Sequence, residues 1–262
     1  MDKTKLVLPG AIIIAGLLIG GAIIFVNKPK TADTSATAQN SNPPASLDIS
    51  AVSSSDHIMG DPNAPFVFVE YSDLQCPYCQ AFHPTMHQVL TENSGKVAWV
   101  FRQFPLTSIH QYAEALAEGS ECANELGGND GFWKFADSVY GAKTLPTPAA
   151  AAKLAGLDAT KFGACLSSGK YADKVGKSGA EATSAGGRGT PFTIIVMKQA
   201  MSAATIASIK SLNAQILAQL QPGSPDILAV SADSTKLELG GALPYDLMTQ
   251  VIKIVAGSYP IK

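Results

Sequence analysis

The sequence predicts an α/β fold in which a helical insertion interrupts a sheet domain, preceded by one N-terminal transmembrane helix. Residues 66–69 and 97–104 are apolar, β-prone runs, and residues 76–91 between them have helical spacing. Strand, helix and strand in this order form the crossover unit of a parallel sheet. A helix-rich stretch follows at about 111–185 before the strand pattern returns. The third observation is an uncharged apolar run near the N-terminus.

This N-terminal run covers residues 6–26, which are 21 residues without a charged side chain. As a helix it spans roughly 30 Å, the thickness of the hydrocarbon part of a bilayer. A cleaved signal peptide has a shorter apolar region before a small-x-small site, and a buried helix of a soluble domain is the other alternative. We predict an uncleaved membrane anchor at residues 1–28. Two lysines precede the run and two follow it, so the positive-inside rule does not decide its orientation.

The composition changes after the anchor. Residues 29–46 are rich in Thr, Ala, Ser, Asn and Pro, which is typical of a flexible linker. Residues 47–262 contain no internal repeat and are predicted to form one domain, with enough apolar residues (46% of the chain) to build a core. The net charge is −2 and basic residues cluster only near the N-terminus, which argues against a nucleic-acid partner.

The second half of the domain continues the alternation of strands and helices. In chain order we predict a strand at 192–197, an amphipathic helix at 203–220, short strands at 226–230 and 236–239, and a final helix at 245–256. The apolar face of the amphipathic helix either packs on the sheet or docks a partner or a membrane surface.

Two of the four cysteines stand in the motif Cys76-Pro77-Tyr78-Cys79, where a helix follows a buried strand. Positions i and i+3 lie on one helix face, and unpaired N–H groups at the helix start favour a thiolate. Pro77 suits the first helical turn because it lacks an N–H group. We predict that Cys76 is the nucleophile and Cys79 the resolving thiol. A structural disulfide is one alternative. Zinc is the other, but His83 would complete only three ligands, so we predict no metal and no cofactor.

Four sequence segments together resemble the DsbA-like thiol:disulfide oxidoreductase family of the thioredoxin superfamily. They read FVFVEYSDLQCPYCQAFHPTM, FRQFPL, ECANELGGNDGFWKFADSVY and GGRGTPF. The resemblance covers residues 56–192 and 240–255, most of the predicted domain. It implies a thioredoxin fold interrupted by a helical domain, which agrees with the helix-rich stretch at 111–185. Residues 198–234 depart from the family pattern and form an extra segment.

The resemblance also assigns three residues around the cysteine pair. Thr190-Pro191 matches the family's cis-proline, which faces the disulfide and presents the Thr190 backbone to an extended substrate. Glu70 matches an acidic residue beneath the disulfide that relays the proton of Cys79. Burial would raise the pKa of such a carboxyl group. A solvent-facing Glu70 is the alternative.

Neighbouring residues in the active-site helix have less specific roles. Pro84 either kinks this helix or ends it. We expect His83 near the rim of the site and give His87 and His110 structural roles.

Cys122 and Cys165 lie 43 positions apart, each in a predicted helix of the insertion. In an oxidising compartment two leftover cysteines usually pair. We predict a structural disulfide between them, and two buried free thiols are the alternative.

The resemblance implies an oxidase that passes its disulfide to reduced exported or unfolded proteins. A membrane quinone-linked partner would reoxidise it, and the catalytic domain would lie on the extracytoplasmic side of the cell membrane. The alternatives are a reductase or isomerase on the same fold and a non-catalytic peptide-binding module. Isomerases of this superfamily usually carry an N-terminal dimerisation domain, for which the linker leaves no room, and this argues against an isomerase. We expect a monomer. The Pro-Tyr dipeptide also occurs in reducing glutaredoxins and does not decide the direction.

Overall fold

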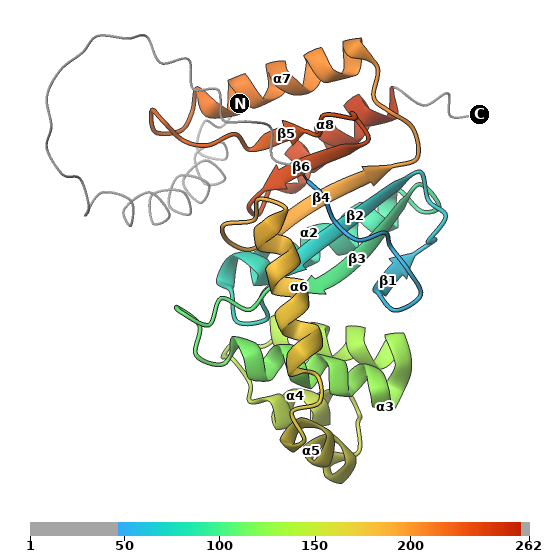
Figure 1. Cartoon of the computed structure of the whole chain (residues 1–262). Coiled ribbons are helices and arrows are strands. Elements are labelled where there is room, and N and C mark those ends of the chain that lie inside the picture. The colour runs from blue at the N-terminus through green and yellow to red at the C-terminus, as the bar shows by residue number, and fades with distance from the viewer. Residues whose placement is uncertain (1–46, 258–262) are drawn as a thin grey trace, which may run out of the picture.

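A six-stranded mixed sheet lies at the centre of the computed structural model, which describes residues 47–257 (Figure 1). The predicted anchor at 1–28 and linker at 29–46 lie outside the described residues. Within residues 47–257 no helix has the length and apolar character needed to cross a bilayer. The strand order is β1-β3-β2-β4-β6-β5, with β1 at His57–Gly60, β2 at Phe66–Ser72, β3 at Val97–Gln103, β4 at Phe192–Met197, β5 at Leu228–Val230 and β6 at Lys236–Gly240.

The predicted crossover unit is present. Strands β2 and β3 pair in parallel, α2 (Pro77–Glu92) connects them, and the other neighbouring strands pair antiparallel. Helix α2 continues through Pro84, so this proline does not end the helix. The sequence analysis missed β1, which is only four residues long and half exposed.

Strand β2 is buried at all seven positions because both faces of the sheet are covered. Phe66 and Phe68 belong to a core with α2 and α8 (Tyr245–Ala256), whereas Val67 and Val69 pack on the other face with the end of α6 (Ala172–Ser184). This two-sided burial explains why the strand reads as a continuous apolar run.

The helical insertion consists of α3 (Ala113–Tyr140), α4 (Pro148–Leu154), α5 (Ala159–Ser167) and α6. Gly128 interrupts α3 with a left-handed φ of 64°, which glycine adopts without steric cost. In Figure 1, α6 runs from the tip of the insertion back to the sheet. There Arg102 of β3 makes an ion pair of 2.9 Å with Glu181 of α6. The predicted helical insertion is therefore confirmed.

The extra segment at 198–234 packs on the domain. Helix α7 (Ala203–Leu217) buries Ile209 and Leu212 in the core shared with α8 and β5. The side-chain amide of Asn213 donates a hydrogen bond of 2.6 Å to Asp226. Its oxygen accepts hydrogen bonds from the backbone N–H groups of Ile227 and Leu228. Of the two alternatives for this helix, packing on the domain is the one that the structure shows.

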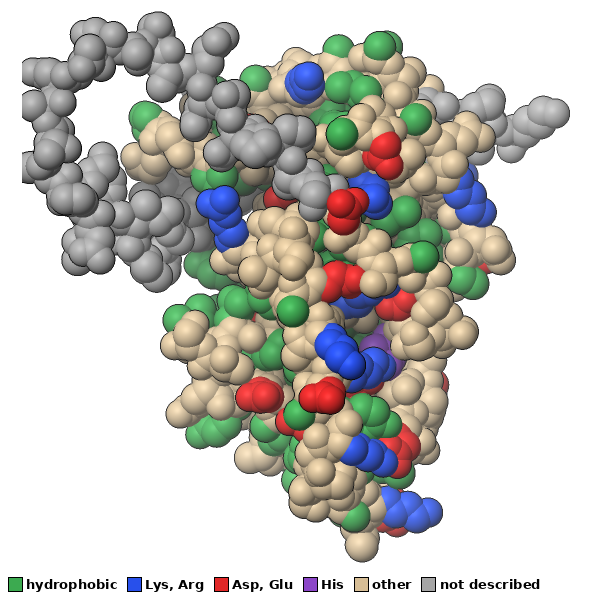
Figure 2. Space-filling view, viewed as in Figure 1, with side chains coloured by type: hydrophobic (Ala, Val, Ile, Leu, Met, Phe, Trp, Pro, Cys, Tyr) green, Lys and Arg blue, Asp and Glu red, His purple; other side chains and the backbone are tan. Residues whose placement is uncertain are grey.

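The face shown in Figure 2 carries basic and acidic side chains interspersed with one another. Among the described residues several charged side chains are paired, such as Lys174 with Glu121 at 2.6 Å. Binding to a phosphate backbone is instead favoured by a surface with a continuous excess of Lys and Arg, which this face does not show.

Candidate active site

The two active-site cysteines lie at the start of α2, directly after the end of β2. The backbone N–H of Cys76 donates to the carbonyl oxygen of Asp73 at 2.9 Å, which closes the turn between strand and helix. Cys76 is the residue before the helix, Pro77 is its first residue, and Cys79 lies in its first turn. Both cysteines are free thiols in this structure. Cys76 is 3% exposed and Cys79 is fully buried, so an incoming sulfur would meet Cys76 first.

The loop before β4 faces this pair. The Sγ atom of Cys76 lies 3.4 Å from the carbonyl oxygen of Thr190, and the peptide bond between Thr190 and Pro191 is cis. The hydroxyl oxygen of Thr190 is buried, and the Thr190 side chain helps to lower the pKa of Cys76. The structure thus brings the predicted Cys76, Thr190 and Pro191 together, with Tyr78 partly buried beside them and Pro77 exposed.

The pKa values of the two thiols are shifted in opposite directions. A hydrogen bond from the Cys79 thiol is the main cause that lowers the pKa of Cys76 to about 6; burial opposes it, and Thr190 and backbone N–H groups at the helix start assist it. The pKa of Cys79 is raised well above its usual value by burial and by the neighbouring sulfur. Near neutral pH Cys76 is therefore the thiolate and Cys79 keeps its proton.

Glu70 lies in β2 beneath this pair and does not face solvent, since it is only 1% exposed. Its Oε2 atom accepts a hydrogen bond of 2.9 Å from the indole Nε1 of Trp99. Burial raises the pKa of Glu70 to about 7, although hydrogen bonds from Ser72 and Trp99 oppose the shift. The charge on Glu70 in turn contributes to the raised pKa of Cys79. A carboxyl group that titrates near neutral pH beside a buried thiol can exchange a proton with it.

The shifted pKa of Glu70 predicts an effect on stability. A folded-state pKa above the unfolded value means that stability is full below about pH 4.5 and is lost as the pH rises through about 7. Between pH 4 and pH 8, the Glu70→Gln variant should therefore lose roughly 2–3 kcal/mol less stability than the unaltered chain. Denaturant unfolding of the reduced protein at the two pH values measures this difference.

Glu92→Gln serves as the control, because Glu92 lies exposed at the end of α2 and its pKa is not raised. The same pH dependence in Glu70→Gln as in the unaltered chain would contradict a Glu70 that is buried and protonated near neutral pH.

The sequence analysis missed two residues that complete the surroundings of the pair. Trp99 holds Glu70, and Tyr140, at the end of α3, places its buried hydroxyl 3.0 Å from the Oγ of Ser72 and 3.1 Å from the carbonyl oxygen of Asp73. Trp99 could have been noticed in the sequence, because it is the only tryptophan in the apolar run at 97–104. No local pattern marks Tyr140, because the chain brings α3 to the site only through tertiary packing.

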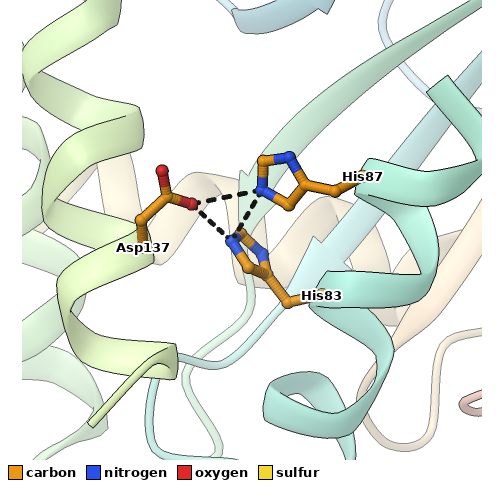
Figure 3. A group of neighbouring side chains, drawn as sticks. All are labelled: His83, His87 and Asp137. Atoms are coloured by element: carbon orange, nitrogen blue, oxygen red, sulfur yellow. Dashed lines mark hydrogen bonds and ion pairs between the residues drawn. The ribbon is translucent and has the colours of Figure 1, made fainter. Parts of the chain in front are cut away.

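The histidines near the site contact carboxylates. His83 and His87 of α2 both face Asp137 of α3 (Figure 3). His83 is buried, and its ring centroid lies 4.7 Å from that of Tyr140, so its place near the rim of the site stays a prediction. His110 lies 2.8 Å from the buried carboxylate of Asp73 through its Nδ1 atom, in the loop that precedes the insertion.

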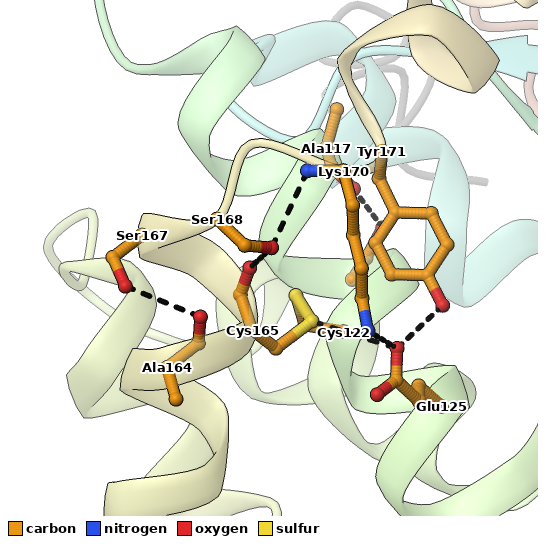
Figure 4. The surroundings of a disulfide bond; sticks show 10 residues. Ala117, Cys122, Glu125, Ala164, Cys165, Ser167, Ser168, Lys170 and Tyr171 are labelled. Carbon is orange, nitrogen blue, oxygen red and sulfur yellow. Dashed lines mark hydrogen bonds and ion pairs between the residues drawn. A yellow bond between two sulfur atoms is a disulfide. The ribbon is translucent and has the colours of Figure 1, made fainter.

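The second cysteine pair lies apart from this site, in the insertion. Cys122 of α3 and Cys165 of α5 form a disulfide that closes a loop of 43 residues (Figure 4). Next to it, Glu125 accepts a hydrogen bond of 2.8 Å from the Tyr171 hydroxyl and forms an ion pair with Lys170. The disulfide joins α3 to α5, and the contacts of Glu125 join α3 to the segment that connects α5 with α6.

Comparisons with known proteins place the fold. Residues 53–213, more than half of the chain, match the thioredoxin family model. The Na(+)/H(+) antiporter NhaA 1 of Salinispora arenicola is 39% identical over 82 residues, which are 31% of this chain but only 12% of the antiporter.

Two solved structures are similar over most of the chain. DsbA2 of Pseudomonas aeruginosa has a TM-score of 0.55 and 22% identity, and the match covers 79% of this chain and 97% of that protein. For alpha-DsbA1 of Wolbachia pipientis the TM-score is 0.55, the identity 21% and the coverage 77% and 91%. The chain therefore belongs to the thioredoxin family and has a DsbA-like fold with a helical insertion.

Proposed function

We propose that this protein is a membrane-anchored, extracytoplasmic thiol–disulfide oxidoreductase that introduces disulfides into exported proteins through Cys76 and Cys79. The proposal rests mainly on the opposite pKa shifts of the two thiols at the start of α2. Cys76 has a pKa of about 6 and lies 3.4 Å from the Thr190 carbonyl oxygen, whereas Cys79 is buried with a raised pKa. A purely structural disulfide does not require such a difference between the pKa values of its two thiols.

The first step is attack on the oxidised pair. A substrate thiolate attacks Sγ of Cys76, a bond forms between the two sulfurs, and the Cys76–Cys79 bond breaks. The electron pair of that bond leaves on Cys79, whose high pKa favours rapid protonation. Glu70, with a pKa of about 7, is placed to supply this proton.

The second step releases the oxidised substrate. A second thiolate of the substrate attacks the substrate sulfur of the mixed disulfide. A disulfide forms within the substrate, and Cys76 leaves as a thiolate. A low pKa makes Cys76 a good leaving group. The substrate has then lost two electrons and the cysteine pair has gained them. A quinone-linked membrane protein is the class of partner that would take these electrons and restore the disulfide.

Four features support the oxidase direction and the location. A stabilised Cys76 thiolate favours the reduced form, which makes the disulfide a stronger oxidant. The fold is similar to proteins named DsbA. The Cys122–Cys165 disulfide is of the kind that persists in oxidising compartments. The apolar run at residues 6–26 would hold the domain at the membrane, and we propose that the chain acts there as a monomer.

Trapping of the mixed disulfide separates this function from a passive binding module. In cells, the Cys79→Ala variant should accumulate disulfide-linked complexes with exported proteins. Its Cys76 thiolate attacks a disulfide of an exported protein and expels one of the two sulfurs as a thiolate, and no Cys79 thiol is present to break the mixed disulfide. The Cys76→Ala/Cys79→Ala double variant is the control and should trap none. If Cys79→Ala traps no more than the control, the protein binds peptides without catalysing exchange.

The redox state of the unaltered chain separates oxidase from reductase. Acid quenching followed by thiol alkylation should find Cys76 and Cys79 mostly oxidised at steady state. A mostly reduced pair would instead indicate a reductase or isomerase on the same fold.

A further inference from the structure

Two histidines and an aspartate converge between the active-site helix and the insertion. His83 and His87 are one turn apart on α2, and Asp137 faces them from α3 (Figure 3). The Oδ1 atom of Asp137 lies 2.7 Å from Nε2 of His83 and 3.2 Å from Nε2 of His87, and the two Nε2 atoms are 3.2 Å apart. One carboxylate oxygen and two ring nitrogens therefore surround a single point.

This spacing fits a metal ion. In a tetrahedral zinc site with ligand distances of about 2.0–2.1 Å, neighbouring ligand atoms are roughly 3.3 Å apart. Two of the three separations are 3.2 Å and the third is 2.7 Å, so a small outward movement of Asp137 would fit the ion. Two imidazoles and one carboxylate are also a donor set that Zn²⁺ accepts, with a fourth position left for water.

The surroundings leave the ring nitrogens available for an ion. The side chain of His83 is 7% exposed, whereas those of His87 and Asp137 are 38% and 48% exposed, so the cluster has a buried base and an open mouth. The Nδ1 atom of His83 has no hydrogen-bond partner among the described residues. Without an ion, Nε2 carries the proton that is donated to Asp137. When an ion binds, the ring proton can move to Nδ1 and leave the Nε2 lone pair facing the ion.

The rings are also held in place by packing. Trp99 lies against both histidines, with ring centroids 5.1 Å from His83 and 5.4 Å from His87. Rings positioned in this way lose little further freedom when they bind an ion.

We propose that His83, His87 and Asp137 form a binding site for Zn²⁺ or a similar divalent transition-metal ion. The ion would join α2, which carries Cys79, to α3 of the insertion, and solvent would supply the fourth ligand. The prediction of no metal concerned the two active-site cysteines and His83, which give only three ligands. Asp137 lies 50 positions beyond His87, so no local motif links it to the histidines. This proposal does not depend on the redox function.

Metal titration of the full-length chain tests the site. The oxidised, chelator-treated protein is used, because its cysteines are then in disulfides and leave no thiolate to compete for the metal. Competition with a chromogenic chelator should show one Zn²⁺ per chain. His87→Gln and Asp137→Asn should each weaken the affinity at least about tenfold. Both side chains are partly exposed, so these variants should fold.

Asp130→Asn is the matched control, because it removes the same charge from an exposed position of α3 and should leave the affinity unchanged. A second measurement uses Co²⁺, whose open d shell quenches nearby tryptophans. It should reduce tryptophan fluorescence in the unaltered chain and much less in His87→Gln, because Trp99 and Trp133, the two tryptophans of the chain, both lie close to His83. If the chain binds no stoichiometric Zn²⁺, or binds it equally well in both cluster variants, the three residues form only a hydrogen-bonded group and the proposal is wrong.

Discussion

Replacing Cys76 with serine is expected to reduce thiol–disulfide exchange by at least about 10³-fold, because the attacking and leaving sulfur is lost. The hydroxyl group of serine neither ionises near pH 6 nor forms a disulfide, whereas the pKa of Cys76 is about 6. The measurement is the rate at which the oxidised chain forms a disulfide in a reduced peptide with two cysteines.

A matched variant separates the reaction from general damage to the fold. Cys122→Ser/Cys165→Ser removes two cysteines from the insertion, away from the reacting sulfurs. At a temperature where it is folded, it should keep most of the exchange rate. If Cys76→Ser retains a rate close to that of the unaltered chain, another group performs the reaction and the assignment of Cys76 is wrong.

The same Cys122→Ser/Cys165→Ser variant is expected to lose roughly 4 kcal/mol of unfolding free energy. The disulfide closes a loop of 43 residues, and chain entropy in the unfolded state predicts a contribution of about this size. Denaturant unfolding of the oxidised proteins measures it. Cys76→Ser/Cys79→Ser is the control, since its pair closes a far shorter loop and should cost much less. A loss below about 1 kcal/mol in the insertion variant would show that this bond does not stabilise the domain.

The central strands and the active-site helix could be predicted because their sequence patterns are local. The apolar run at 66–69 and the helical spacing after Cys76 have the periods of a buried strand and an amphipathic helix. The strand extends to Ser72, beyond its predicted end. The prediction stopped too early because the acidic Glu70, although buried, breaks the apolar pattern of the sequence. Strand β1 has too few residues to show a pattern, and its pairing with β3 alone defines it.

The residues of the site likewise fall into those that a sequence motif or the family resemblance predicts and those that tertiary packing brings in. Cys76, Pro77 and Cys79 are neighbours in sequence, so their motif could be recognised, and the resemblance supplied Thr190, Pro191 and Glu70. The partners that set the chemistry come from distant elements. Trp99 holds Glu70 from the next strand, whereas Tyr140 and Asp137 arrive with the last turns of α3. Their positions depend on how the insertion packs on α2, and no spacing in the sequence records that packing.

Equilibration with glutathione measures whether Cys76 and Cys79 form an oxidising redox pair. The protein is held in buffers of varied reduced-to-oxidised glutathione ratio, quenched with acid, and its free thiols are alkylated and counted. Because the thiolate of Cys76 is stabilised, we expect a midpoint potential above about −200 mV, well on the oxidising side of the roughly −270 mV of thioredoxin. A midpoint at or below about −270 mV, or a pair that does not exchange with glutathione, would contradict it.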